Sequence, residues 1–308
     1  MRGAVGHTGM MRSRVIDLDG PVHVADFGGS GTPIVLVHGL GGSHANWLCV
    51  GERLAERGRV LAPDLAGFGR TPLAGRTADV DANRALLDRF VAAVADGPVI
   101  LVGNSMGGLI AMMQAARHPE TVAALVLVGP AQPRPSARFI DPLVGLTFAA
   151  YAFPGIGERL MRWRAARLGP ERTVRQTLAF CCADATCLPP DVVAAHVALA
   201  RERHTMPWAH AAFLQAARSL VAMVARRRAL AGVVRAIAAP TLIVQGSVDR
   251  LVPLAASRAT VALRPDWSLA VFDGIGHVPQ LEAPERFVAT TFAWLDAQIP
   301  TATRRESS

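Results

Sequence analysis

The chain contains no lysine, so all 32 of its lysine-plus-arginine residues are arginine. A P-loop needs a lysine to reach the phosphates of a nucleotide, and a Schiff-base enzyme needs a lysine amine, so both classes are excluded. Cysteine is scarce as well. The four cysteines match neither a disulfide framework nor a familiar zinc-ligand spacing; they are Cys49, Cys181, Cys182 and Cys187. We therefore expect no metal. The Gly-x-Gly spacings of the chain lack the context of a dinucleotide-binding motif, so we also expect no cofactor.

Long hydrophobic runs are also missing. The longest apolar stretch without charge, around residues 142–157, is too short to span a bilayer and is interrupted by proline and glycine. Residues 1–14 contain arginine but no apolar core of the kind that a signal peptide carries. These absences predict a cytoplasmic protein.

Positive charge is in excess, with a formal net charge of +8. Such a charge attracts acidic partners, for example nucleic acid or anionic lipid. The arginines are spread along the chain and no nucleic-acid recognition motif accompanies them, so we expect no nucleic-acid partner. A local cluster, Arg226 to Arg228, lies in an otherwise apolar region. Peripheral membrane contact through this part of the chain therefore stays open.

Short apolar runs alternate with helix-length segments through the first 130 residues. Residues 13–18 and 22–27 alternate apolar with polar residues around an Asp-Gly-Pro turn, which predicts an antiparallel hairpin. Four unbroken apolar runs predict strands buried in a parallel sheet, at 34–37, 60–62, 99–102 and 125–128. Helices are expected between them, at 45–57, 81–94 and 106–117. The alternation predicts a doubly wound α/β fold.

The pattern changes after residue 130. Residues 131–236 are rich in alanine, arginine and other helix formers and contain no convincing strand. Two strand runs follow at 241–244 and 269–272, with a last helix over 285–298. We therefore expect a core built from residues 1–130 and 237–308, with residues 131–236 inserted as a helical cap.

The most informative motif is Gly-Asn-Ser-Met-Gly-Gly at residues 103–108. A serine with glycine two positions before and two after, between a strand and a helix, is typical of a nucleophile elbow. The tight turn strains the serine backbone and leaves no room for a Cβ at Gly103 or Gly107. The hydroxyl of Ser105 is then presented at the sheet edge, near the positive end of a helix dipole.

A serine nucleophile needs a base, usually a histidine oriented by a carboxylate. Asp249 and His277 each follow one of the two late strands, so both belong at the carboxyl edge of the sheet where Ser105 lies. The order Ser, Asp, His is that of α/β-hydrolases. Asp273 is a second candidate acid, but it would have to fold back across its own loop to reach His277. We expect His38 to be a structural residue that holds the oxyanion loop. His196, His204 and His210 are expected to be surface or packing residues of the cap.

An acyl-transfer site also needs donors for the developing oxyanion. One would be the N–H of Met106, next to the nucleophile. The second is expected from the loop His38-Gly39-Leu40-Gly41-Gly42, in which the Leu40 N–H is best placed. Glycines such as Gly39 let this backbone approach a substrate.

The chain resembles the α/β-hydrolase fold superfamily, and in particular members with a helical cap. Four motifs agree in order and context: the oxyanion loop, Pro63-Asp-Leu-Ala-Gly-Phe-Gly69, the elbow, and Gly276-His-Val-Pro279. The resemblance covers roughly residues 20–130 and 238–298. It implies that the cap roofs the active site and sets the substrate pocket. It also implies that Asp64 and Gly67 belong to a structural turn rather than to the chemistry.

Within this superfamily, the residue at the elbow narrows the reaction. Dehalogenases and epoxide hydrolases carry aspartate there, so Ser105 disfavours both. Carbon–carbon bond hydrolases of the meta-cleavage type share a similar elbow, but they usually have tryptophan directly after the histidine and a Ser-Gly oxyanion loop. Val278 and Leu40 occupy those positions in this chain, and both departures favour ester hydrolysis.

We therefore predict a carboxylesterase or lipase-like enzyme acting on a small-molecule or lipid ester with an apolar acyl group. The cap supplies aromatic side chains that could line its pocket: Phe139, Phe148, Phe153, Trp163, Phe180 and Trp208. Predicted substrate contacts are Gly39, Trp163, Trp208 and Val278. The alternatives are carbon–carbon bond hydrolysis, and a non-catalytic ligand-binding protein on the same fold. Thioesterase and acyltransferase activity would use the same residues.

Overall fold

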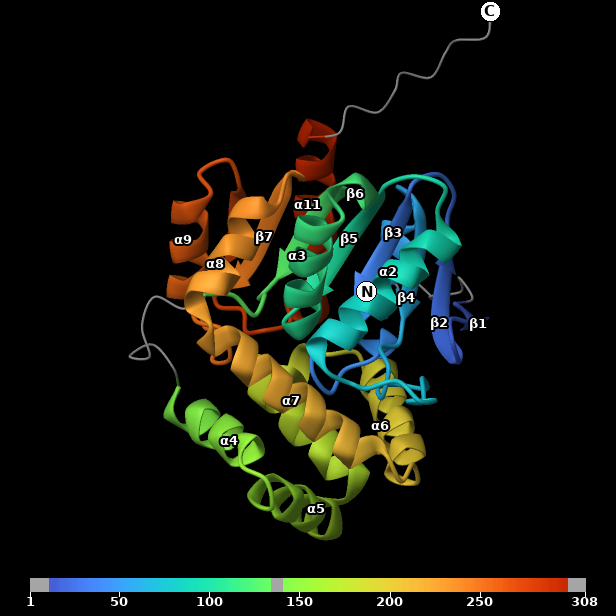
Figure 1. Ribbon diagram of the computed structural model, residues 1–308, viewed down its shortest axis with the longest axis vertical. Coiled ribbons are helices and arrows are strands. Elements are labelled where there is room, and N and C mark those ends of the chain that lie inside the picture. The colour runs from blue at the N-terminus through green and yellow to red at the C-terminus, as the bar shows by residue number, and fades with distance from the viewer. Residues whose placement is uncertain (1–10, 134–140, 299–308) are drawn as a thin grey trace, which may run out of the picture.

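The computed structural model describes residues 11–133 and 141–298, and its centre is an eight-stranded sheet (Figure 1). The strand order is β1-β2-β4-β3-β5-β6-β7-β8. The strands span Arg12–Asp17 (β1), Pro21–Gly28 (β2), Pro33–Val37 (β3), Arg59–Pro63 (β4), Val99–Asn104 (β5), Val122–Val128 (β6), Thr241–Gly246 (β7) and Ser268–Phe272 (β8).

The six strands β4, β3, β5, β6, β7 and β8 pair in parallel, in that order across the sheet. Strands β1 and β2 form an antiparallel hairpin, and β2 pairs antiparallel with β4. Every residue of β5 and β7 is buried. Strands covered on both faces need apolar residues on both faces, which explains their unbroken apolar sequence. The predicted hairpin, parallel sheet and α/β class are confirmed.

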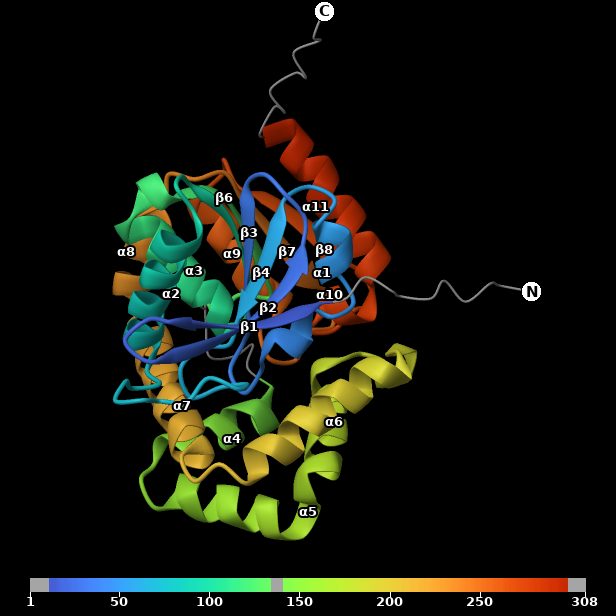
Figure 2. The ribbon, with the colours of Figure 1, turned by 90° about the vertical axis from the view of Figure 1, so that its right-hand side faces the viewer.

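Helices cover both faces of the sheet (Figure 2). One face carries α2 (Val80–Val94), α3 (Met106–Arg117), α8 (Arg227–Ala236) and α9 (Leu254–Leu263). The other carries α1 (Gly51–Leu54), α10 (Pro279–Glu282) and α11 (Pro284–Gln298). Each layer packs its own apolar cluster against the sheet, so the core has two halves.

The prediction of a single helix over residues 45–57 is wrong. The structure has a short 3-10 turn, His44–Trp47, followed by the four-residue α1. Ser43 and Asn46 close the 3-10 turn with a capping box, which fixes its start. The break also brings Gly51 against the Phe27 ring, where a Cβ would lie 2.4 Å from the ring. A helical pattern in the sequence is a weak guide where capping and tertiary contacts act on so short a segment.

The remaining helices gather at one end of the molecule, beyond the sheet edge (Figures 1 and 2). We call these four helices the candidate cap: α4 (Pro142–Ala152), α5 (Ile156–Cys181), α6 (Pro190–His204) and α7 (Ala209–Ala225). Helix α8 falls within the predicted cap range, but it packs on α3 and α9 beside the sheet. We therefore propose to end the cap near Arg226. Phe139 lies outside the described residues.

In the described ranges, no helix is both long enough and apolar enough to cross a membrane.

Candidate active site

Ser105 lies at the turn between β5 and α3, as the elbow motif predicts. Its φ of 57° and ψ of −117° put it in a strained region that residues other than glycine rarely adopt. A Cβ on Gly103 would lie 2.5 Å from the Gly107 carbonyl oxygen, and one on Gly107 would lie 2.2 Å from the Val37 carbonyl oxygen. Both glycines are therefore required for the turn to close.

Replacing Gly107 with alanine is expected to destabilise the fold by at least about 3 kcal/mol, because the added methyl meets fixed backbone atoms. Gly232→Ala in α8 is the matched control, since nothing lies within 4 Å of its Cβ position. That change should be neutral or raise stability by up to about 1 kcal/mol. Urea unfolding measures both. Equal stabilities of the two variants would contradict the steric account.

His277 and Asp249 form a buried pair, with 2.8 Å between His277 Nδ1 and Asp249 Oδ2. The carboxylate is held by further donors. Its Oδ1 accepts the N–H groups of Leu251 and Val252, each at 2.8 Å, and Gln245 Nε2 donates to Oδ2 at 2.9 Å. A carboxylate fixed in this way can orient the imidazole and stabilise its protonated form.

Asp273, the other candidate acid, is exposed and has a different partner. It accepts a hydrogen bond from Ser247 Oγ at 2.9 Å. Asp249, and not Asp273, is therefore the residue that the fold brings to His277.

The elbow and the histidine loop are tied together by residues to which the sequence assigned no role. Asn104 Nδ2, one residue before the candidate nucleophile, donates to the Val128 carbonyl at 2.9 Å and to the His277 carbonyl at 3.3 Å. Gly129 follows β6 with a φ of 47°, and a Cβ there would lie 3.0 Å from both Asp249 Oδ2 and His277 Nδ1. The motif contains Asn104, but only the folded structure shows what its amide contacts.

The predicted oxyanion loop lies against the elbow. A Cβ on Gly39 would lie 3.1 Å from the Ser105 Cβ, so the loop backbone passes directly beside the serine. Leu40 is half-buried beside it. Met106 is the first residue of α3, where backbone N–H groups lack a partner within the helix. The Leu40 and Met106 amides are thus the candidate oxyanion donors.

His38 fixes this loop in place. Its Nδ1 lies 2.8 Å from the Gly39 carbonyl, and its Nε2 accepts the N–H of Leu65 at 3.0 Å. This pattern requires a neutral ring, with the proton on Nδ1. Burial lowers the pKa of His38 to about 4 and outweighs the attraction of the Asp64 carboxylate. His38 is therefore a structural residue of the loop, and its environment disfavours the protonated form.

This lowered pKa predicts a pH-dependent stability. Because the folded pKa lies below the usual 6.5, the contribution is complete above pH 6.5 and is lost as the pH falls toward 4. The shift corresponds to a loss on the order of 3 kcal/mol. Free energies of unfolding at pH 7 and pH 4 should therefore differ more in the wild type than in His38→Asn. Exposed His204→Asn is the control and should follow the wild type. Identical pH dependence in the wild type and His38→Asn would refute the assignment.

A second buried cluster supports the same loop from behind. Asp64 accepts the N–H of His44 at 2.7 Å and the N–H of Arg70 at 2.9 Å, and the Nδ1 atoms of His23 and His44 lie 2.9 and 3.0 Å from its Oδ2. Burial alone would raise the pKa of Asp64, but the two histidine rings beside its carboxylate hold that pKa well below its usual range. Asp64 thus fastens the turn, as the resemblance implies.

This cluster is also the one group of described residues whose ligand atoms lie close enough to hold a metal ion. The atoms of His23, His44 and Asp64 lie within 4.8 Å of one another. The carboxylate oxygens, however, already accept two backbone N–H groups. A hydrogen-bonded structural role accounts for these contacts.

The predicted substrate-contacting residues fall in different surroundings. Gly39 is beside Ser105, as described above. Val278 is buried in a small apolar cluster with residues of α5 and α6. Trp208 is half-buried against the core, and the Arg203 guanidinium lies 5.4 Å from its ring. Trp163 lies on the exposed face of α5, so we leave it out of the proposed pocket.

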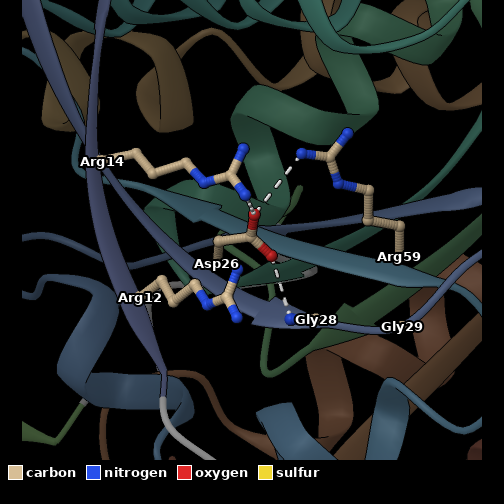
Figure 3. Close-up of a pocket in the computed structure, with 6 residues that line it drawn as sticks. All are labelled: Arg12, Arg14, Asp26, Gly28, Gly29 and Arg59. Atoms are coloured by element: carbon tan, nitrogen blue, oxygen red, sulfur yellow. Dashed lines mark hydrogen bonds and ion pairs between the residues drawn. The ribbon is translucent and has the colours of Figure 1, made fainter.

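The cavity shown in Figure 3 lies away from these residues. It has a volume of about 370 Å³, and Arg14 and Arg59 converge in it on Asp26. Arg59 begins β4, so the cavity is at the amino end of that strand. Ser105, Asp249 and His277 instead follow the carboxyl ends of their strands, where ligands of open α/β sheets bind. The cavity in Figure 3 is therefore separate from the candidate active site and lies at the opposite ends of the parallel strands.

The family model for the α/β-hydrolase fold matches residues 32–284, and the chain belongs to this family. The chain is 32% identical over 279 residues to a 2-hydroxymuconate semialdehyde hydrolase of Pseudomonas sp. strain CF600, covering 85% of this chain and 86% of that protein. It is 32% identical over 255 residues to a pimeloyl-[acyl-carrier protein] methyl ester esterase of Aromatoleum aromaticum, covering 82% and 93%.

Among solved structures, a serine hydrolase involved in carbazole degradation superposes with a TM-score of 0.70 at 26% identity, covering 94% of this chain and all of that one. The protein is thus a hydrolase of the α/β-hydrolase superfamily, with esterases and meta-cleavage product hydrolases among its relatives.

Proposed function

We propose that the protein is a serine hydrolase that cleaves carboxylic esters with an apolar acyl group. The observation that carries the proposal is the buried Asp249–His277 pair, 2.8 Å apart at the carboxyl edge of the sheet. The strained Ser105 lies at the same edge, and its neighbour Asn104 donates to the His277 carbonyl. Strain at a surface turn persists only when the surrounding structure holds it, and such positions cluster at active sites.

In the proposed reaction, Ser105 Oγ forms a bond to the ester carbonyl carbon while its proton passes to His277. The Leu40 and Met106 amides donate to the oxyanion that develops. The carbon–oxygen bond to the alcohol then breaks, and His277 returns the proton to the departing alcohol. A water molecule attacks the acyl-enzyme in the same way, giving its proton to His277. The acid leaves and Ser105 regains its hydrogen.

The proposed apolar acyl group rests on the candidate cap. Leu40 of the oxyanion loop and Phe213 of α7 both pack against the small buried cluster of Tyr151, Leu214 and Ala217. The ring of Phe148 meets that of Tyr151 with 6.2 Å between centroids, and Trp208 is half-buried against the core. The Phe213 ring also lies beside Gly41, where a Cβ would be 3.1 Å away. Apolar walls around a few polar groups are typical of ligand pockets.

A panel of p-nitrophenyl esters from acetate to dodecanoate tests this proposal. Because each buried methylene contributes about 0.8 kcal/mol, kcat/KM should rise roughly fourfold per added methylene until the pocket is filled. Rates that do not vary with chain length would contradict the apolar pocket. Saturable binding of the esters without turnover would favour a non-catalytic ligand-binding protein.

Carbon–carbon bond hydrolysis is the second candidate, supported by the relatives of that activity. The ester is preferred because Val278 and Leu40 depart from the pattern of those enzymes. Assaying 2-hydroxymuconate semialdehyde beside the best ester separates the two. We expect a kcat/KM at least 100-fold higher for the ester. The reverse ratio would reassign the reaction.

A further inference from the structure

Helices α4 and α5 present an apolar surface that nothing in the described chain covers. They belong to the cap end of the molecule, beyond the sheet edge, and α5 lies at its tip (Figures 1 and 2). Among the described residues, seven large apolar side chains are exposed, and five of them belong to this segment. They are exposed by 54% (Leu143), 70% (Leu146), 61% (Phe153), 53% (Ile156) and 55% (Trp163).

The sequence of α4 makes this exposure unusual. The helix contains no charged residue, and its apolar residues are distributed around its whole circumference. A helix of this kind is normally buried on all sides. Here only one side packs inward, where Val144 and Tyr151 are buried and the Tyr151 ring meets Phe213 of α7 with 5.2 Å between centroids. The outer side has no packing partner among the described residues.

Charge indicates what that partner is. Residues 142–170 contain four arginines and a single acidic residue, Glu158. Glu158 is paired with Arg218 at 2.9 Å, so its charge is already compensated. Arg159 and Arg162 are exposed on the same part of α5 as Trp163. The surface therefore combines exposed aliphatic and aromatic side chains with net positive charge.

This combination matches an anionic lipid surface. Helices that lie in a membrane interface insert leucine, phenylalanine and tryptophan among the acyl chains while their arginines contact anionic headgroups. A second copy of the chain is a poorer partner, because a symmetric contact would bring these arginines against each other. We propose that the outer face of α4 and the first half of α5 docks on anionic phospholipid bilayers.

Docking by this face would put the inner side of α4, with Tyr151 and its neighbour Phe213, between the bilayer and the oxyanion loop. An ester leaving the bilayer would then meet the candidate pocket first. Only this last consequence depends on the proposed function. The docking surface itself is tested by binding alone.

Vesicle flotation with the full chain tests the proposal, using phosphatidylcholine vesicles with and without 30% phosphatidylglycerol. The wild type should bind the anionic vesicles and bind less at high salt. Leu146→Ser with Phe153→Ser should weaken binding roughly tenfold or more. Arg159→Gln with Arg162→Gln should also weaken it roughly tenfold. The matched control is Val15→Ser, an exposed valine on β1 that should leave binding unchanged.

Tryptophan fluorescence tests whether the bilayer contacts Trp163 itself. Trp163 is exposed on α5, whereas Trp47, Trp267 and Trp294 are buried. Phosphatidylcholine brominated in its acyl chains, mixed with the anionic lipid, should quench emission of the bound wild type. It should quench Trp163→Phe much less, although that variant still binds because phenylalanine keeps the site apolar.

Three results would overturn the proposal. The first is no binding of the wild type to anionic vesicles. The second is unchanged binding of both double variants, with Arg226→Gln and Arg228→Gln causing the loss instead. The third is a wild-type dimer in sedimentation velocity that Leu146→Ser with Phe153→Ser converts to a monomer, which would make this face a contact between copies. Circular dichroism checks that each variant is folded. None of these measurements depends on whether the protein hydrolyses esters.

Discussion

Ser105→Ala is expected to reduce turnover of the best ester on the order of 10⁶-fold, with the fold intact. Removing the nucleophile of a serine triad abolishes acyl-enzyme formation and leaves only the catalysis from oxyanion donors and binding. The strained backbone at residue 105 does not depend on the hydroxyl, because the positions of Gly103 and Gly107 create it. KM should therefore change little. Steady-state kinetics with purified variants measures both quantities.

The matched control is Ser30→Ala, which removes the hydroxyl of an exposed serine in the loop between β2 and β3. Its kcat and KM should equal those of the wild type. Residual turnover in Ser105→Ala within tenfold of the wild type would show that another group performs the reaction.

Asp249→Asn is the second large effect, expected at about 10⁴-fold in kcat. The asparagine has the same shape, but its amide is neutral and can present an N–H to His277 Nδ1. The imidazole then loses both its orienting acceptor and the negative charge that stabilises its protonated form. Three donors surround the native carboxylate, from Gln245, Leu251 and Val252, so part of the loss will come from weakened hydrogen bonds.

Asp273→Asn is the control, because this residue was the rival acid in the sequence. Its carboxylate accepts from Ser247 and is exposed, so kcat should stay within about threefold of the wild type. A large loss in Asp273→Asn together with a small loss in Asp249→Asn would reverse the assignment.

Local chemistry made the core of this protein predictable. Unbroken apolar runs identified buried parallel strands, and the spacing of glycines around Ser105 identified a turn that only glycine can close. Asp249 and His277 could be placed at one edge because parallel strands end at the same edge. Each of these inferences uses a constraint that acts within a few residues or within one sheet.

Other features depend on contacts that no local pattern encodes. The segment expected as one helix over residues 45–57 is a 3-10 turn followed by the short α1, whose first residue, Gly51, packs on Phe27 of β2. Asn104 joins the elbow to His277 through a carbonyl 173 positions away. The sequence favours Asp249 over Asp273 through loop position alone, whereas the folded loops show the partner of each carboxylate.

The cap was the least predictable part. Its aromatic residues recur at helical spacing, which is compatible with a pocket, a cap core or an outer surface. In the structure, Phe148 packs inward while Phe153 and Trp163 are exposed. An apolar helix such as α4 offers no polar face to orient it, so its packing is set by its neighbours. The same ambiguity leads to the proposed docking surface.

Covalent labelling of Ser105 tests the central claim most directly. A fluorophosphonate reacts with a serine hydroxyl that an adjacent base activates, and it forms a stable adduct. Mass spectrometry of the intact chain should show one adduct per molecule in the wild type, located on the peptide that contains Ser105. The Asp249→Asn variant should label far more slowly, and Ser105→Ala should not label. An unlabelled wild type, or an adduct on another serine, would contradict the account.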